Sequence, residues 1–256
     1  MAFSIRQTAI LDLARADGRV AVEALAQRFA VTLQTIRRDL SELADAGHLV
    51  RVHGGAMRKT GVVNIEYAER RLMNDAAKAA IGRACAAAIP DNASIIMNLG
   101  TTTEAVARQM LTHRNITVVT NNINIANILL DNPNCDIIVA GGALRRADGG
   151  LVGELTTQFF EQFKVDYAVI GVSALDGDGD LLDYDLAEVR VAKTIIRQAR
   201  QRYLVTDGSK LQRSAPVRLA SLAEIDTLFT DRPLPADLAA KCHAWDTAIS
   251  LSPGTD

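Results

Sequence analysis

The sequence predicts two domains, a small winged helix-turn-helix followed by a larger α/β domain. Three observations predict this fold class. The first 57 residues contain three short amphipathic segments and then an alternating segment that meets a Gly-Gly pair. From residue 74 onward, β-branched apolar runs alternate with helical stretches. The chain has 256 residues, enough for two domains, and we expect them at 1–57 and 74–256, joined by a linker at 58–73.

Composition and charge indicate a globular protein whose N-terminal part, residues 1–60, binds a polyanion. Hydrophobic residues make up 48% and charged residues 23%, and no apolar run reaches the roughly 20 residues that a membrane span needs. Residues 1–60 contain nine Lys and Arg against six Asp and Glu, whereas the remainder contains 19 against 24. We therefore expect only residues 1–60 to bind a polyanion.

Cysteine usage and the first residues bear on where the protein works. Cys85, Cys135 and Cys242 lie far apart and show neither a metal-ligand spacing nor a disulfide pattern. The start, MAFSIRQTAILDLARADGRV, carries charges throughout, unlike a secretion signal. We expect a cytoplasmic protein that has no metal or cofactor and does not bind a membrane.

Residues 33–47 form the predicted DNA-reading helix, after two shorter helices at 4–16 and 22–29. Its apolar positions recur at spacings of three and four and should face inward: Leu33, Ile36, Leu40 and Leu43. Thr32 is a good N-cap, and Gly47 stands where a helix often ends.

The opposite face of that helix is polar and basic. The candidate DNA-binding residues are Thr32, Gln34, Thr35, Arg37, Arg38 and Ser41. They gather near the helix N-terminus, the end that enters the major groove, where Gln and Arg bond base edges and Thr and Arg bond phosphates. A solvated surface, with the arginines beside Asp39 and Glu42, is the alternative. An alternating segment at 49–53 before the Gly-Gly turn predicts a wing hairpin, which favours DNA binding.

The second domain reads as a mostly parallel sheet covered by helices on both faces. Apolar runs predict strands at 94–97, 116–119, 137–140, 167–172, 203–206 and 227–230. Ligands of such sheets bind outside the carboxyl ends of the strands. Five polar loops follow these strands, and we expect them to converge on one edge of the sheet: 98–103, 120–122, 141–142, 173–176 and 207–210.

The first of these loops, in the stretch NLGTTTEAV, is suited to a phosphate. The candidate ligands are Gly100, Thr101, Thr102 and Thr103, with Lys210 as a counter-charge from another strand end. Glycine lets a phosphate approach the backbone, and the hydroxyls add donors to the N–H groups of the helix start. As an alternative, Thr101 and Glu104 fit a capping box and simply begin a helix, and Lys210 is a solvated loop lysine.

Several stretches resemble one protein family. The stretch VTLQTIRRDLSELADAGHLVRVHGGA resembles the DNA-binding region of the DeoR family of bacterial transcription regulators. The stretches VTNNINIANIL, AGGALRRADGGLVGE and TDGSK resemble its C-terminal sensor domain, which is similar in fold to ribose-5-phosphate isomerases and related sugar-phosphate enzymes. The resemblance covers essentially the whole chain. It implies that Gln34, Thr35, Arg37 and Arg38 lie in or beside the operator's major groove, and that Arg51 and His53 lie near the DNA backbone.

The resemblance also implies a repressor that a phosphorylated small metabolite, glycerol 3-phosphate or a sugar phosphate, releases from double-stranded operator DNA. We expect a homodimer or homotetramer, because two DNA-binding domains must meet two half-sites. The metabolite's hydroxyls are expected to meet residues on the loops and on one helix: Asn121, Gly142, Asp176 and Glu188. Arg145 or Arg146 either reaches the ligand or belongs to a surface pair.

An isomerase-like enzyme carrying a DNA-binding domain is the alternative function. Such an enzyme needs carboxylates to move a proton between carbons, but the strand at 167–172 is followed by no acid before Asp176. We interpret most acids of 176–185 as solvated turn residues. The missing acid favours sensing over turnover.

Overall fold

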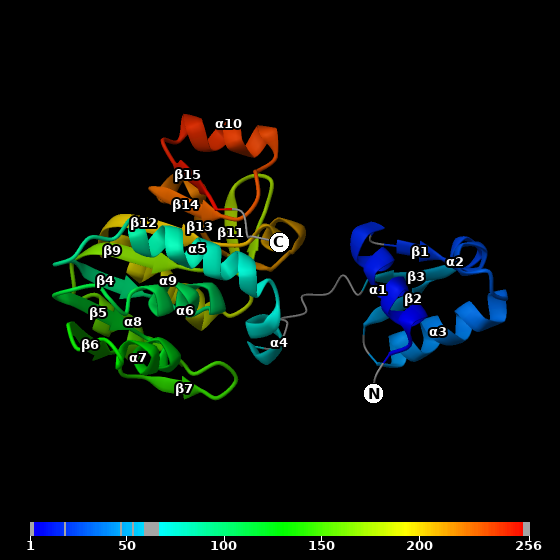
Figure 1. Ribbon diagram of the computed structural model, residues 1–256, viewed down its shortest axis with the longest axis horizontal. Helices are drawn as coiled ribbons and strands as arrows, with labels where there is room; N and C mark the ends of the chain where they lie inside the picture. The colour runs from blue at the N-terminus through cyan, green and yellow to red at the C-terminus, as the bar shows by residue number, and fades with distance from the viewer. Residues whose placement is uncertain (1–2, 18, 47, 53, 59–66, 253–256) are drawn as a thin grey trace. The chain divides into compact units, whose positions relative to one another are not determined.

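A computed structural model describes residues 3–252 except 18, 47, 53 and 59–66. The chain divides into two compact units, Met1–Val63 and Asn64–Asp256, here called the head and the sensor unit (Figure 1). None of the described helices is long and apolar enough to cross a membrane.

The head is a winged helix-turn-helix, as predicted. Its elements are α1 (Ile5–Asp17), β1 (Arg19–Ala21), α2 (Val22–Phe29), α3 (Leu33–Asp45), β2 (Leu49–Val52) and β3 (Gly55–Arg58). The strands form an antiparallel sheet in the order β1-β3-β2, of which β1 was not predicted. Ile36, Leu40 and Leu43 are fully buried, but Leu33, at the first position of α3, is 42% exposed, contrary to the prediction.

The sensor unit is built on a seven-stranded parallel sheet in the order β15-β14-β12-β9-β4-β5-β6. Its strands are β4 (Ser94–Met97), β5 (Ile116–Thr120), β6 (Cys135–Val139), β9 (Val165–Ile170), β12 (Ala199–Val205), β14 (Thr227–Thr230) and β15 (Ala248–Leu251). The helices are α4 (Tyr67–Leu72), α5 (Asp75–Ala87), α6 (Thr101–Gln109), α7 (Ile123–Leu129), α8 (Glu154–Phe160), α9 (Leu186–Arg197) and α10 (Ala236–Ala244), with short 3-10 helices η1 (Gly208–Gln212) and η2 (Leu222–Glu224).

Two small antiparallel sheets, which the sequence did not predict, complete the unit. One pairs β7 (Ala143–Arg145) with β8 (Gly150–Val152). The other has the order β10-β11-β13 and consists of β10 (Ala174–Leu175), β11 (Asp180–Asp183) and β13 (Val217–Ser221).

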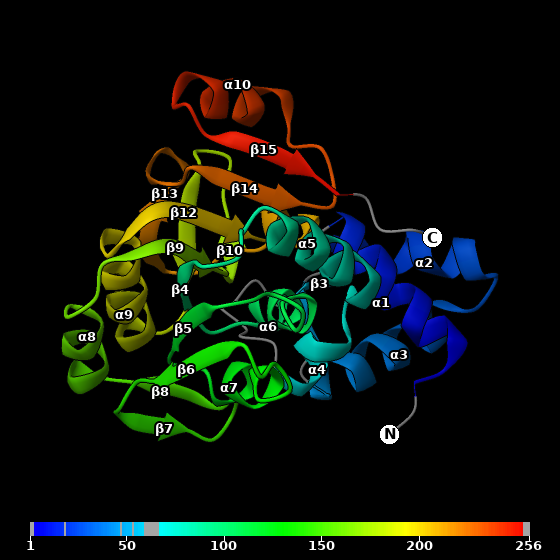
Figure 2. The same ribbon diagram turned by 60° about the vertical axis from the view of Figure 1, so that its left-hand side comes forward.

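Helices cover both faces of the large sheet. Figure 2 shows α5, α6 and α7 on one side and α8 and α9 on the other. Successive residues of β4 point to opposite sides: Ile95 joins the apolar cluster under α5 and α6, and Ile96 joins the cluster under α9. Both residues are fully buried, so the predicted layered α/β architecture is confirmed.

Candidate functional site

The order of the strands reverses between β4 and β9. From β4 the chain adds β5 and β6 on one side, whereas β9, β12, β14 and β15 follow on the other. Ligands of open α/β sheets bind at the carboxyl ends of the strands at such a reversal. The strands β6, β5, β4, β9 and β12 are consecutive in the sheet, so the five predicted polar loops follow five neighbouring strands.

The loop after β4 ends at Gly100, which is the N-cap of α6. Its φ of 144° lies in a region that residues other than glycine rarely adopt. Because the helix begins at Thr101, the alternative capping box between Thr101 and Glu104 is not formed. The hydroxyl of Thr103 lies 2.9 Å from the carbonyl of Asn98 and 2.7 Å from that of Gly100, so its hydrogen is used within the loop.

The two other threonines of this loop differ in their surroundings. Thr102 is buried. Thr101 lines an open groove of about 630 Å³ between α4, α5 and α6, together with Lys78 and Glu104. Of the three threonines, Thr101 is therefore the one that lines this groove.

Glu104 belongs to a buried hydrogen-bond cluster that includes α4. The hydroxyl of Tyr67 donates to both carboxylate oxygens, at 2.8 and 2.9 Å. The side-chain amides of Asn122 and Asn124 donate to the same carboxylate at 3.3 and 3.2 Å. Asn124 also donates to Tyr67 and to the carbonyl of Asp148, both at 2.9 Å. Glu104 thus fastens the predicted linker to the sensor unit.

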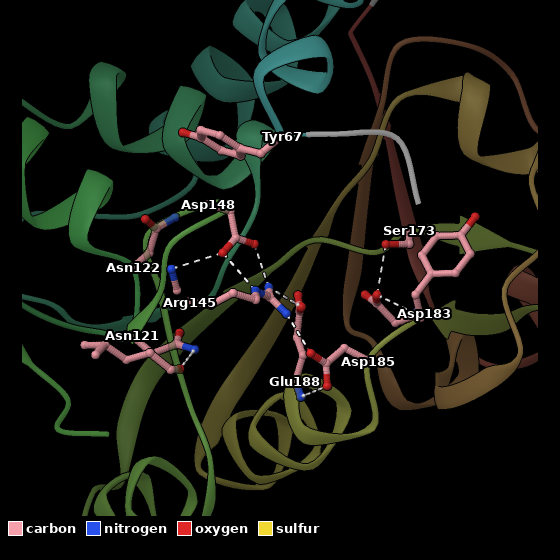
Figure 3. A network of polar contacts seen from close by, with 12 residues as sticks. Tyr67, Asn121, Asn122, Arg145, Asp148, Ser173, Asp183, Asp185 and Glu188 are labelled. Carbon is pink, nitrogen blue, oxygen red and sulfur yellow. Dashed lines mark hydrogen bonds and ion pairs between the residues drawn. The ribbon is translucent and has the colours of Figure 1, made fainter. Parts of the chain in front are cut away.

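Arg145 is the centre of an ion-pair network (Figure 3). Its guanidinium binds Asp148 at 2.9 and 2.5 Å, Asp185 at 2.8 Å and Glu188 at 2.6 Å. Burial lowers the pKa of Arg145, but these carboxylates outweigh burial and raise that pKa above its ordinary value. Arg145 is therefore not one of a surface pair, whereas Arg146 is exposed.

Glu188, a member of this network, and the nearby Asp183 have raised pKa values. Burial, with the nearby charge of Asp183, raises the pKa of Glu188 to about 7 although Arg145 opposes the shift. Burial also raises the pKa of Asp183, whose carboxylate accepts a hydrogen bond from Ser173 at 2.9 Å. Asp183 is an exception to the interpretation of most of these acids as solvated turn residues, because β11 carries it under the loop after β9, where it is 6% exposed.

Cationic side chains gather beside the loop after β12. Lys78, on α5, is 5% exposed, and its ammonium donates to the carbonyl of Arg70 on α4. The ammonium of Lys210 makes no hydrogen bond or ion pair with the described residues. Burial, followed by repulsion from Arg213, lowers its pKa to about 7. Arg70 and Lys78 add to this repulsion. Burial lowers the pKa of Lys78 as well.

Asp207 offsets part of this positive charge. Its carboxylate accepts from Asn74 at 2.9 Å and from the backbone of Ser209 at 3.1 Å. Burial raises the pKa of Asp207, but the bond from Ser209 and the charge of Lys210 bring it below its ordinary value. Asp75 also acts on Lys78, so two carboxylates face the four cations Arg70, Lys78, Lys210 and Arg213. The excess of positive charge suits an anion.

Buried polar atoms without a hydrogen-bond partner concentrate at the same edge of the sheet. Six side chains of the described residues carry such an atom, and five of them lie here: Arg70, Asn98, Asn121, Thr206 and Ser209. The sixth, His113, lies in the loop that leads into β5, at the opposite edge. Buried polar groups are nearly always paired, so this concentration marks a place where a polar ligand or water completes the bonding.

Two further candidates have structural roles. Asp176 accepts hydrogen bonds from the backbone of Asp178 and Asp180 at 3.0 and 2.9 Å, and so holds the turn between β10 and β11. That turn meets α10, where Asp178 pairs with Lys241 at 3.0 Å, and Asp183 rather than Asp176 reaches the network. Gly142 has a φ of 145°, and a Cβ there would lie 2.1 Å from the hydroxyl of Thr156.

In the head, α3 presents the predicted DNA-reading side chains. Thr32 is its N-cap and accepts from the backbone of Thr35 at 3.2 Å. Gln34, Arg37, Arg38 and Ser41 are exposed. Arg38 pairs with Glu42 at 3.0 Å, while Asp39 turns inward to Arg6 at 2.6 Å. The inward turn of Asp39 leaves the outer face more basic than the sequence indicated.

The two candidates of the wing are less fully described. Arg51 lies on β2, opposite Ala56 on β3. His53 lies outside the described residues. Among the described residues, no group of three or more His, Cys, Asp or Glu is arranged to hold a metal ion.

Comparison with known families covers both units. Residues 6–61 match the DeoR-like helix-turn-helix domain, and residues 73–232 match the DeoR C terminal sensor domain. The chain belongs to the DeoR family. It is therefore a transcriptional regulator.

Relatives within the DeoR family are similar over nearly their whole length. The glycerol-3-phosphate regulon repressor of Escherichia coli (strain K12) is 41% identical over 91% of this chain and 92% of its own. The repressor of the same name from Haemophilus influenzae is 43% identical over 89% of both chains. The HTH-type transcriptional repressor CsqR of Escherichia coli is 37% identical over 96% of this chain and 94% of its own.

Among solved structures, ribose 5-phosphate isomerase A from Methanocaldococcus jannaschii is similar to part of the chain. It has a TM-score of 0.39 and 12% identity, and the similarity covers 54% of each chain.

Two cations beside the candidate site, Lys78 and Arg70, were not among the predicted site residues. Lys78 precedes Ile81 by three residues and Cys85 by seven, so the helical pattern already placed a lysine on a buried face. Arg70 had no such signal, because the stretch around it lacks periodicity.

Proposed function

We propose that this protein is a repressor whose affinity for operator DNA is lowered by a small phosphorylated metabolite. The excess of buried positive charge at the strand reversal carries this proposal. Lys78 and Lys210 would neutralise the phosphate, and the unpaired hydroxyls of Thr206 and Ser209 would donate to it. The names of the relatives support the same ligand class.

Operator recognition would rest on α3. Its exposed Gln34 and Arg37 have the chemistry to bond base edges, and Thr35 and Arg38 to bond phosphates. Thr32 and Ser41 flank this set, and Arg51 and His53 in the wing would meet the DNA backbone. Two heads of a homodimer or homotetramer would then occupy half-sites about one helical turn, ~34 Å, apart. Such a protein works in the cytoplasm, where the DNA is.

The remainder of the metabolite would lie between the start of α6 and the loop after β5. The carbonyl oxygens of the Asn98 and Asn121 side chains lack hydrogen-bond donors, which the hydroxyls of a polyol phosphate would supply. Gly100, Thr101 and Thr102 would meet it at the N-terminus of α6, and Glu188 would accept from a further hydroxyl. Glycerol 3-phosphate has the required groups, and a sugar phosphate is the alternative ligand.

The experiment is operator binding titrated with metabolites. The operator is first selected from a library of random duplexes with the full-length protein. Fluorescence anisotropy then follows release by glycerol 3-phosphate, ribose 5-phosphate, fructose 6-phosphate, inorganic phosphate and unphosphorylated glycerol. We expect one organic phosphate to release the DNA at a lower concentration than the others. Release by none of them, or equal release by unphosphorylated glycerol, contradicts the proposal.

A second candidate function is catalysis by the buried acids. Asp183 and Glu188, whose pKa values are raised, are the kind of groups that move protons. Against this, Glu188 is held by Arg145 at 2.6 Å. Incubation of the purified protein with ribose 5-phosphate tests for isomerisation, and we expect no product above that of a Glu188→Gln variant.

A further inference from the structure

Helix α4 joins the candidate site to the chain that leads to the head. Tyr67 bonds Glu104, and Arg70 lies 3.9 Å from Asp148. In the sequence, only residues 59–66 separate this helix from β3 of the head. A six-residue helix is too short to be stable by itself. Its position therefore depends on the residues it touches in the sensor unit.

Arg70 has the surroundings of a ligand-binding residue. Its side chain is 20% exposed, and its Nε atom has no hydrogen-bond partner in the described structure. The ammonium of Lys78 donates to the carbonyl of Arg70, and the charge of Arg70 lowers the pKa values of both Lys78 and Lys210. Arginine offers a planar set of donors that matches the oxygens of a phosphate. An anion between the two lysines would therefore also face Arg70.

Arg70 makes only a weak contact with its present partner, Asp148. Asp148 lies 3.9 Å away, whereas the same carboxylate bonds Arg145 at 2.5 and 2.9 Å. If Arg70 moved to a phosphate, Asp148 would still be neutralised by Arg145. The exchange would therefore leave no buried carboxylate unpaired, and its cost would be small.

Tyr67 anchors the other end of α4 to different residues. Its hydroxyl bonds Glu104 and Asn124, neither of which is a cation of the pocket. Burial, followed by the bond to Glu104, raises the pKa of Tyr67, so the hydroxyl stays protonated and continues to donate. The helix is thus fixed at Tyr67, and at Arg70 its backbone is bonded by Lys78 while the guanidinium is held only loosely.

We propose that Arg70 binds the anionic group of the effector together with Lys78 and Lys210, and that α4 carries this change to the DNA-binding head. The inference rests on the proposed function and extends it to the regulation of the same site. An effector shifts the protein only by as much as it binds one state better than the other. In this proposal Arg70 supplies that difference by exchanging Asp148 for the anion.

The test uses full-length variants and two separate measurements. Calorimetry with sn-glycerol 3-phosphate gives the effector's Kd without DNA. Anisotropy gives the coupling ratio, which is the operator Kd at saturating effector divided by that without effector. The variants are Arg70→Gln and Tyr67→Phe. Arg71→Gln is the matched control, because Arg71 lies on the same helix, is exposed and loses the same charge.

We expect Arg70→Gln to raise the effector's Kd at least about tenfold, since a charge-assisted hydrogen bond is lost. Tyr67→Phe should leave that Kd within about threefold but lower the coupling ratio at least about fivefold. Arg71→Gln should change neither. Backbone hydrogen exchange of residues 67–72 in the wild-type protein should change when the effector is added. If the contacts of α4 were only structural, the exchange would stay the same.

Each part of the proposal has its own contrary result. A wild-type effector Kd in Arg70→Gln removes Arg70 from the site, and a wild-type coupling ratio in Tyr67→Phe removes α4 from the signal. Should Tyr67→Phe fail to fold, Glu104→Gln weakens the same bond and serves in its place. If the wild-type protein binds neither glycerol 3-phosphate nor any other organic phosphate, the proposed function fails first and this inference fails with it.

Discussion

The hydroxyl of Tyr67 donates a hydrogen bond to the buried carboxylate of Glu104, with oxygen–oxygen distances of 2.8 and 2.9 Å. Tyr67 comes from the segment predicted to be a linker, and Glu104 comes from the first turn of α6, at the carboxyl edge of the sheet. Glu104 is 1% exposed, so loss of this donor would leave a buried charge with weaker support. The segment before α5 is thus an integral part of the sensor unit.

Lys210→Met should separate effector sensing from DNA binding. Lys210 offers the pocket an ammonium group with no ion pair among the described residues, so its loss should weaken effector binding by about 1.5–3 kcal/mol. Operator affinity without effector should stay unchanged. Anisotropy titrations measure both quantities, with Lys193→Met, an exposed lysine on α9, as the control. An unaltered effector response in Lys210→Met would remove Lys210 from the site.

Effector affinity should fall as the pH rises above neutrality. Burial lowers the pKa of Lys210 to about 7, so the lysine is increasingly neutral above that pH in the protein without ligand. A bound phosphate stabilises the ammonium and raises its pKa, so binding takes up a proton. Between about pH 7.5 and about pH 9 we expect the affinity to drop by up to about tenfold per pH unit.

Calorimetry in buffers of different ionisation enthalpy measures this proton uptake directly. The Lys210→Met variant should bind without it. A variant that keeps the wild-type pH slope would assign the uptake to another group.

Arg37→Ala should weaken operator binding and leave effector binding as it is. Arg37 lies on the exposed face of α3, and loss of one cationic contact to DNA should also reduce the slope of log affinity against log salt by about one. Arg83→Ala, which removes an exposed arginine from α5, is the control of equal charge. Loss of both activities in Arg37→Ala would argue against a division of labour between the units.

Gly55→Ala should destabilise the head alone. A Cβ at this position would lie 2.1 Å from the carbonyl oxygen of Val20, within the pairing of β1 and β3. The strands must separate to admit it, at a cost of about 1–3 kcal/mol. The only tryptophan, Trp245, lies in the sensor unit, so its fluorescence should keep the wild-type melting temperature while circular dichroism shows an earlier partial loss.

For Gly55→Ala, operator binding should weaken and effector binding should persist. Gly177→Ala, where a Cβ meets open space, should change neither transition. A single fluorescence transition shifted to lower temperature in Gly55→Ala would mean that the units unfold together.

The fold could be predicted because its signals are local. The apolar runs of β4 and β5 are bounded by polar loops, and the spacing of Ile36, Leu40 and Leu43 is helical. The two small sheets were missed, because β7, β8 and β10 are only two or three residues long and owe their form to tertiary packing.

The sequence predicted which loops form the candidate site, because these loops follow from the order of the strands. The loops after five strands could be named, but not which loop atoms are already bonded within the protein. Thr103 looked like a phosphate donor, yet its hydroxyl is used by its own loop. Arg145 and Asp183 are brought together by β7 and β11, two strands that the sequence did not reveal.

The place of Tyr67 bears on how DNA-reading heads could be exchanged between related regulators. A chimera joined at residue 74, the boundary that the sequence pattern suggested, would discard both Tyr67 and Arg70. Glu104 would then lose the hydrogen bond that the Tyr67 hydroxyl donates to it. A junction before Tyr67 carries these contacts along with the new sensor. Recombination of such genes would therefore be tolerated best upstream of α4, and a designer of metabolite-responsive switches should cut there.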